Sequence, residues 1–224
     1  MLQHDNLPNQ SAYWDEWHRK INKRVPDWGT HFPLAEEVLP LFEMRQASPM
    51  LDLACGQCND SIYFAQQKFE VYAIDFSSVA LDKAMTTIKA EGIKSIHLYQ
   101  RDIAAPLPFE NGKFRAVYSH LGLQYFSDSA TRFIFSEIYR VLQRDGLLAF
   151  NVKSVQDVRY GEGINLGPDI YNNNGHIRHF FRKEYIMELL TDWEVMLIEE
   201  YKVSYGGSSE ESSFIKVIAS KQTP

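Results

Sequence analysis

The sequence predicts an α/β protein with a seven-stranded, mostly parallel sheet and helices on both faces of that sheet. Between residues 48 and 153, short apolar runs alternate with segments of helical periodicity, as in repeated strand–helix units. Two further apolar runs near the C-terminus are joined by a Gly-Gly-Ser-Ser segment (206–209), which indicates a hairpin with an antiparallel last strand. The chain has 224 residues, of which 45% are hydrophobic, enough for the core of one such domain.

Each predicted strand is a short apolar run. In chain order the strands cover residues 49–54, 71–75, 95–100, 114–119, 147–152, 194–203 and 214–219.

The helices between these strands show apolar residues at three- and four-residue spacing. They cover residues 59–69, 77–92, 130–142 and 180–190. Asn59 or Asp60 can cap the first helix, and Ser77 or Ser78 can cap the second, because their side-chain oxygens accept from free helix N–H groups.

Two segments fall outside this alternation. Residues 1–47 are expected to form a helical lead-in or lid, rich in aromatic side chains, before the main domain at residues 48–224. Residues 155–181 are rich in glycine, asparagine and polar groups. They are predicted to form a long loop that caps a substrate, because such long loops in compact domains are usually functional or mobile.

Composition argues against several classes of partner. Lysine and arginine total 23 against 29 acidic residues, for a formal charge of −6, so we expect no nucleic-acid partner. The first ten residues have neither a basic nor an apolar region, and the apolar runs are too short to span a bilayer. We therefore expect no signal peptide and no membrane partner. With only two cysteines the chain has no disulfide framework, so we expect a cytoplasmic location. We also expect a monomer or homodimer.

The two cysteines of the chain form a Cys-x-x-Cys, Cys55 to Cys58. A structural zinc site needs four ligands, and no second ligand pair is evident, so we expect no metal. A thioredoxin-like redox motif also lies between a strand and a helix, but it gives no role to the carboxylates nearby. The alternative is a glycine-type loop in which cysteines stand beside Gly56.

Three carboxylates at successive strand ends favour that alternative. The loop 52–58 begins with Asp52, contains small residues and opens a helix, so its N–H groups can face an anionic or zwitterionic ligand. Asp75 ends the next strand, where an acid can accept from both ribose hydroxyls. Asp102 follows the third strand and can accept from the amino group of a base. Together these positions predict an adenosine-containing ligand.

These motifs resemble those of class I S-adenosylmethionine-dependent methyltransferases, loosely the small-molecule type that includes thiopurine and tellurite methyltransferases. The segments that carry the resemblance are LDLACGQCND (51–60), VYAIDFS (71–77), RDIAAPLPFENGKFRAVYS (101–119) and IYRVLQRDGLLAF (138–150). The resemblance implies a Rossmann-like fold, S-adenosyl-L-methionine as cofactor and S-adenosyl-L-homocysteine as product. The family pattern has glycine where this chain has Ala54 and Cys58.

The resemblance also implies roles for individual residues. Those expected to bind the cofactor are Asp52, Ala54, Cys55, Gly56, Asp75, Phe76, Asp102, Ile103 and Ser119, with Trp28 and Phe32 from the lead-in. The candidates for substrate contact are Tyr13, Trp17, Tyr160, His176 and His179. His120, directly after the fourth strand, is the candidate general base; the alternative is that it only lines the pocket.

The expected reaction is methyl transfer to a small-molecule acceptor. The fourth strand is not followed by the Asn- or Asp-Pro-Pro-Tyr motif common in enzymes that methylate base or amide nitrogens, and no basic module is attached. Two alternatives stay open. One is an RNA or protein methyltransferase, and the other is a catalytically silent module that binds S-adenosylmethionine or S-adenosylhomocysteine.

Overall fold

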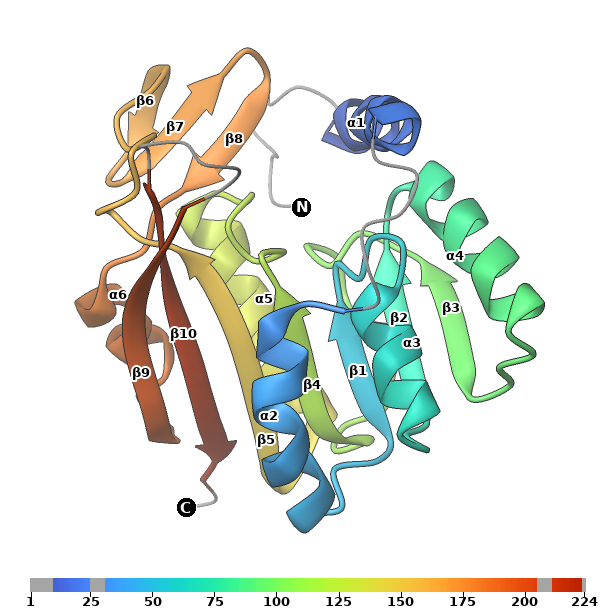
Figure 1. Ribbon diagram of the computed structural model, residues 1–224. Coiled ribbons are helices and arrows are strands. Elements are labelled where there is room, and N and C mark those ends of the chain that lie inside the picture. Colours follow the sequence, from blue (N-terminus) through green and yellow to red (C-terminus); the bar gives the residue numbers. More distant parts are fainter. Residues whose placement is uncertain (1–9, 25–30, 205–210, 223–224) are drawn as a thin grey trace.

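Seven strands of the computed structural model form one twisted sheet in the order β3-β2-β1-β4-β5-β10-β9 (Figure 1). The structure describes residues 10–24, 31–204 and 211–222. The strands are β1 (Met50–Leu53), β2 (Val71–Asp75), β3 (Ile96–Gln100), β4 (Phe114–His120), β5 (Leu142–Lys153), β9 (Trp193–Ser204) and β10 (Glu211–Lys221). The first five are mutually parallel, whereas β10 runs antiparallel to both β5 and β9. The predicted fold class is confirmed.

Helices cover both faces of this sheet. They are α1 (Gln10–Arg24), α2 (Pro33–Met44), α3 (Asn59–Gln66), α4 (Ser78–Ala90), α5 (Asp128–Val141) and α6 (Lys183–Leu189). Apolar residues of α2, α3 and α4 pack on one face, and those of α5 and α6 pack on the other. Because β1 to β5 are parallel, their carboxyl ends meet at one edge, and α1 lies across this edge (Figure 1).

The segment expected as a long loop contains a small antiparallel sheet of its own. Its strands are β6 (Ile164–Gly167), β7 (Ile170–Asn173) and β8 (His176–His179), in that order. Asn174 and Gly175 join β7 to β8 with φ angles of 53° and 85°. Asn-Gly is a strong hairpin signal because both turn positions need positive φ, so this hairpin could have been predicted from the sequence.

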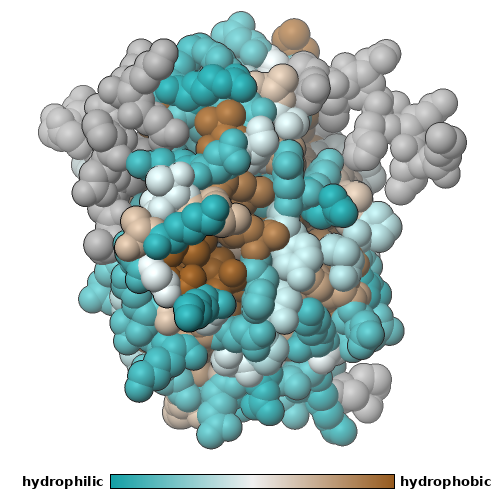
Figure 2. Space-filling model, turned by 90° about the vertical axis from the view of Figure 1, so that its right-hand side faces the viewer, coloured by the Kyte–Doolittle hydropathy of each residue, from teal (hydrophilic) through white to brown (hydrophobic). Residues whose placement is uncertain are grey.

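The surface is mainly polar. The side of the molecule that carries α4 and β3 is largely hydrophilic, with apolar side chains visible in a few places near its middle and towards its top (Figure 2). Some large apolar side chains are exposed, for example Met44 on α2 and Met85 on α4, as is ordinary for folded proteins. Within the described residues, no helix is both long and apolar enough to cross a membrane.

Candidate active site

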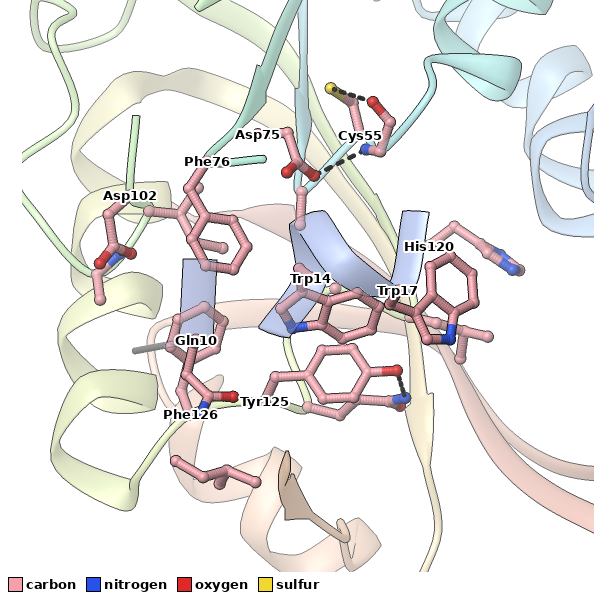
Figure 3. Close-up of a pocket in the computed structure, with 18 of the residues that line it drawn as sticks. Gln10, Trp14, Trp17, Cys55, Asp75, Phe76, Asp102, His120, Tyr125 and Phe126 are labelled. Atoms are coloured by element: carbon pink, nitrogen blue, oxygen red, sulfur yellow. Dashed lines mark hydrogen bonds between the residues drawn. The ribbon is translucent and has the colours of Figure 1, made fainter. Parts of the chain in front are cut away.

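A cavity of about 780 Å³ lies at the carboxyl edge of the parallel strands. Side chains from α1, from the loop after β1 and from the ends of β2, β4 and β5 line it. Figure 3 shows Trp14 and Trp17 of α1 beside Tyr125, with Phe76 and Asp102 to one side and His120 to the other. The volume falls in the range typical of small-molecule and cofactor sites.

The loop after β1 turns through three left-handed residues. Ala54, Gly56 and Cys58 have φ angles of 56°, 54° and 63°, a conformation that costs non-glycine residues roughly 1–2 kcal/mol. These are the positions at which the family pattern has glycine, so the structure keeps the turn although two of the three glycines are replaced.

The two thiols in this loop lie close together. Cys58 Sγ and Cys55 Sγ are 3.5 Å apart, and both cysteines are free. Burial raises the pKa of the Cys55 thiol well above its usual range, which disfavours the reactive thiolate. The pair is therefore a packed part of the loop.

Gly122, after β4, packs directly against this loop. A Cβ atom at Gly122 would lie 2.5 Å from Ala54 Cβ and 2.9 Å from Ser119 Oγ. We expect Gly122→Ala to lower the free energy of unfolding by about 1–3 kcal/mol, as other overpacking substitutions do. Urea unfolding of Gly122→Ala and of the double variant Ala54→Gly/Gly122→Ala tests this. The double variant should recover part of the loss, and equal stability of both would contradict the assigned clash.

Asp75 connects the loop to the end of β2. Its Oδ2 accepts from the Gly56 N–H at 2.8 Å, and its Oδ1 accepts from the Ser77 N–H at 2.8 Å. Burial raises the pKa of Asp75, and these backbone hydrogen bonds oppose that shift. Each carboxylate oxygen can accept more than one hydrogen bond. Asp75 lines the cavity, so it fits a ligand that offers two adjacent hydroxyls.

The next part of this half of the cavity is suited to a flat base. Phe76, Asp102 and Ile103 all line it. The Asp102 Oδ1 accepts from the Ala104 N–H at 2.8 Å, which holds the carboxylate in place and leaves its other oxygen for a ligand. The residues at the ends of β2 and β3 are therefore chemically suited to an adenosine group, as the sequence had led us to expect.

Two further carboxylates, Asp52 and Asp60, are buried beneath the loop. The Asp52 Oδ2 accepts from Ser61 Oγ at 2.5 Å, and burial raises the pKa of Asp52 well above its usual range. Burial also raises the pKa of Asp60 to about 6, opposed by hydrogen bonds from the Tyr118 hydroxyl and the Phe32 N–H, each 2.7 Å long. Asp60 therefore ties the segment before α2 to α3.

His120 lies at the end of β4 and lines the cavity. Its ring stacks on Phe32, with centroids 4.1 Å apart and planes at 8°. Among the described residues, the buried Nδ1 of His120 has no hydrogen-bond partner. Burial lowers the pKa of His120 to about 4, so the imidazole is neutral at pH 7 and can accept a proton or a hydrogen bond.

Helix α1 is attached to both sides of the cavity. The Asp15 Oδ1 accepts from Ser77 Oγ at 2.6 Å and from the Val79 N–H at 3.4 Å, at the start of α4. At the other side, Gln10 Nε2 donates to the Gly175 carbonyl at 2.7 Å. The helix thereby holds Trp14 and Trp17 in the cavity wall.

Most of the residues expected at the site line the cavity. These are His120, Asp52, Ala54, Cys55, Gly56, Asp75, Phe76, Asp102, Ile103, Phe32 and Trp17. Trp28 lies outside the described residues. Ser119, Tyr13, Tyr160, His176 and His179 are not part of the lining.

Those residues have other contacts. Ser119 is buried and donates to the Leu53 carbonyl at 2.8 Å, so it joins β4 to the end of β1. Tyr13 stacks on His176 with centroids 4.6 Å apart, behind Trp14 and Tyr125. His179 lies 3.4 Å from Thr131 Oγ1, and the Tyr160 hydroxyl donates to Asp169 at 2.6 Å.

Sequence reasoning missed a second set of lining residues. It includes Trp14, His18, Asp60, Gln124, Tyr125, Lys153, Arg159, Ser212 and Phe214. The end of β5 and the start of β10 meet at one edge because these strands are antiparallel. That topology was predicted, so residues 153 and 212–214 could have been placed at the site from the predicted strands alone.

Comparisons with known proteins point to one family. Residues 50–146 match a family described as a methyltransferase domain. The malonyl-[acyl-carrier protein] O-methyltransferase of Salmonella typhimurium is 29% identical over 162 residues, which are 71% of this chain and 59% of that protein. The chain spans little more than half the length of the curated relatives it matches.

Solved structures share the fold. An S-adenosylmethionine-dependent methyltransferase from Methanosarcina mazei matches with a TM-score of 0.70 at 19% identity, covering 88% of this chain and 100% of that one. The 1,6-didemethyltoxoflavin-N1-methyltransferase of Burkholderia thailandensis, solved with that compound and S-adenosylhomocysteine, has a TM-score of 0.68 at 15% identity. The structural match covers 96% of this chain and 89% of the Burkholderia thailandensis chain.

The family match covers β1 to the start of β5, which is the part of the chain that provides the left-handed loop and the carboxylates Asp52, Asp75 and Asp102. The chain therefore shares the fold of S-adenosylmethionine-dependent methyltransferases, and its residues 50–146 match a methyltransferase domain.

Proposed function

We propose that the protein transfers a methyl group from S-adenosylmethionine to a small-molecule acceptor. One observation carries this proposal: a single cavity runs from the loop after β1 to the ends of β4 and β5, beneath α1. It therefore offers adjoining places for a cofactor and an acceptor. The Burkholderia thailandensis neighbour, whose name gives a small-molecule substrate, supports this class of acceptor.

The cofactor half lies over β1, β2 and β3. Asp75 would accept from the ribose hydroxyls, and Asp102 with Ile103 would border the adenine beside Phe76. The loop residues Asp52, Ala54, Cys55 and Gly56 would border the methionine part.

S-adenosylmethionine supplies a methyl group already activated by the positive charge on its sulfur. The protein's own tasks are to align the acceptor atom and to keep water out, which lowers the entropic part of the barrier. His120 is neutral at pH 7 and lines the cavity. It would take the proton from an acceptor that must lose one, such as a hydroxyl.

In this proposal α1 is a lid, and Asp15 is its anchor on α4. We expect Asp15→Asn to weaken S-adenosylhomocysteine binding by about three- to ten-fold, because a charge-assisted hydrogen bond to the start of α4 is lost. Calorimetric titration measures this. Glu16→Gln is the matched control, since Glu16 is exposed and pairs only with Arg19 and Lys20 among the described residues. Equal affinities of both variants would contradict the anchoring role.

The test of the proposed function is a titration of reduced protein with S-adenosylhomocysteine, with NAD as control. We expect binding at micromolar strength or tighter, and no binding of NAD. A labelled methyl donor then allows acceptors to be screened. Failure to bind S-adenosylhomocysteine under reducing conditions would refute the proposed function.

Several expectations from the sequence stay predictions. They are the cytoplasmic location, the monomeric or homodimeric state, and the lack of nucleic-acid, membrane and metal partners.

A further inference from the structure

The charges that line the cavity are divided between its two halves. The carboxylates Asp52, Asp60, Asp75 and Asp102 line the half over β1, β2 and β3. Lys153 and Arg159 line the half over β5 and β10, and the third lining cation, Arg101, is next to Asp102 at the opposite end. The chain as a whole has a net charge of −6. Two cations on one side of the cavity therefore point to a ligand with a negative charge.

Lys153 retains a donor for a ligand. Its Nζ donates to Asp157 Oδ2 at 2.5 Å and lies 3.4 Å from Ser212 Oγ. An ammonium group has three donors, so these contacts leave one. Burial lowers the pKa of Lys153, and the pairing with Asp157 opposes the shift.

Arg159 supplies a charge in excess of the Lys153–Asp157 pair. Its backbone N–H donates to Asp157 Oδ1 at 3.0 Å, which fixes the backbone at the edge of the cavity. Among the described residues, its guanidinium has no hydrogen-bond or ion-pair partner. Asp157 is buried and also accepts from the Ser213 N–H at 3.1 Å, so its capacity is already used within the protein.

The neighbouring cation Arg178 is engaged elsewhere. Its Nη1 lies 3.3 Å from Glu162 Oε2, and neither residue is part of the cavity lining. The corner formed by Lys153, Asp157 and Arg159 therefore has one net positive charge, carried by a fork of donors that matches a carboxylate.

Aromatic side chains border the same half of the cavity. Tyr125 and Trp14 meet edge to face, with centroids 4.7 Å apart, and Lys153 Nζ lies 4.7 Å from the centroid of the Phe214 ring. Tyr125 also stacks on His176 at 5.0 Å. Walls of this kind favour a flat or otherwise apolar body.

We propose that the methyl acceptor is an aromatic or similarly apolar carboxylic acid whose carboxylate is bound by Lys153 and Arg159. This proposal rests on the proposed function, because it takes the half over β5 and β10 as the acceptor half. It narrows the substrate to anionic molecules and assigns Arg159 as a residue that determines specificity.

The test compares acids with their neutral and cationic counterparts. The probes are 4-hydroxyphenylacetate and indole-3-acetate, their primary amides, and the amines tyramine and tryptamine, each titrated into protein saturated with S-adenosylhomocysteine. We expect the acids to bind roughly ten-fold or more tightly than the amides, since charge-assisted hydrogen bonds are about twice as strong as neutral ones. Amines should bind most weakly. Equal affinities, a reversed order, or no binding of the acids to the saturated protein overturns the proposal.

Variants locate the carboxylate. Arg159→Gln should weaken binding of the acids by roughly ten-fold and leave the amides unchanged. Arg144→Gln is the matched control, because Arg144 is exposed at the opposite end of β5. Lys153→Met alone would leave Asp157 buried without its partner, so the second variant is Lys153→Met/Asp157→Asn. If both variants still prefer the acids over the amides, the assignment of the carboxylate site is wrong.

Different results would refute the proposed function and the proposed carboxylate site. Loss of S-adenosylhomocysteine binding in the wild-type protein would refute the proposed function. Normal binding of S-adenosylhomocysteine without a preference for acids would refute only the carboxylate site.

Discussion

Replacing Asp75 with alanine is expected to weaken S-adenosylhomocysteine binding by about 100-fold or more. Two hydrogen bonds from ribose hydroxyls to a carboxylate would be lost, each worth roughly 1.5–3 kcal/mol. The carboxylate is also held rigidly, because its two oxygens accept from the Gly56 and Ser77 N–H groups. Isothermal titration calorimetry measures the change.

The same substitution leaves those two N–H groups without their acceptor. We expect the free energy of unfolding to fall by about 1–3 kcal/mol, so affinity must be measured well below the unfolding temperature. Asp75→Asn keeps an acceptor oxygen and should lose less of both properties. Asp82→Ala, at an exposed position of α4, should leave the affinity unchanged. Wild-type affinity in Asp75→Ala would refute the ribose assignment.

Replacing His120 with alanine is expected to reduce kcat by about 100- to 10,000-fold if the acceptor must lose a proton, the usual contribution of a general base. S-adenosylhomocysteine affinity should change little, since His120 lies at the β4 end of the cavity and not over β2 or β3. His120→Phe keeps a ring to stack on Phe32 and separates packing from proton transfer. Equal turnover of the wild type and both variants would mean that His120 only lines the wall.

The pH profile gives a second check on His120. Burial lowers its pKa to about 4, so the base form dominates above that value and is lost as the pH falls through it. Activity should therefore persist well below pH 6.5 and decline only towards pH 4. His97→Ala is the control, because His97 lies near the start of β3, paired with Glu70. A decline centred near 6.5 would show that His120 is not desolvated in the working enzyme.

The sheet could be predicted because its information is local. Each parallel strand was evident as a short run of neighbouring residues, and Asp52, Asp75 and Asp102 followed from their positions at or just beyond the ends of the first three. The lead-in was expected as a lid with Trp17 at the site, but the contacts that hold α1 there could not be predicted, since those with Ser77 and Gly175 join residues far apart in the chain.

The histidines show the same limit. His176 and His179 were expected to touch substrate because they lie in the segment that follows β5. Their aromatic neighbours Tyr13 and Phe181 hold them in the protein interior instead. A buried aromatic cluster and a substrate site have the same composition, and only long-range packing distinguishes them.

The position of α1 also has a thermodynamic consequence for the helix itself. A helix of 15 residues is marginal on its own, and α1 is held to the domain by a few contacts at each side. Linkage is reciprocal: whatever binding free energy a ligand gains from Trp14 and Trp17, the docked helix gains from the ligand. Occupancy of the cavity should therefore be reported by slower amide hydrogen exchange along α1, although this helix is not part of the strands that carry Asp52 and Asp75.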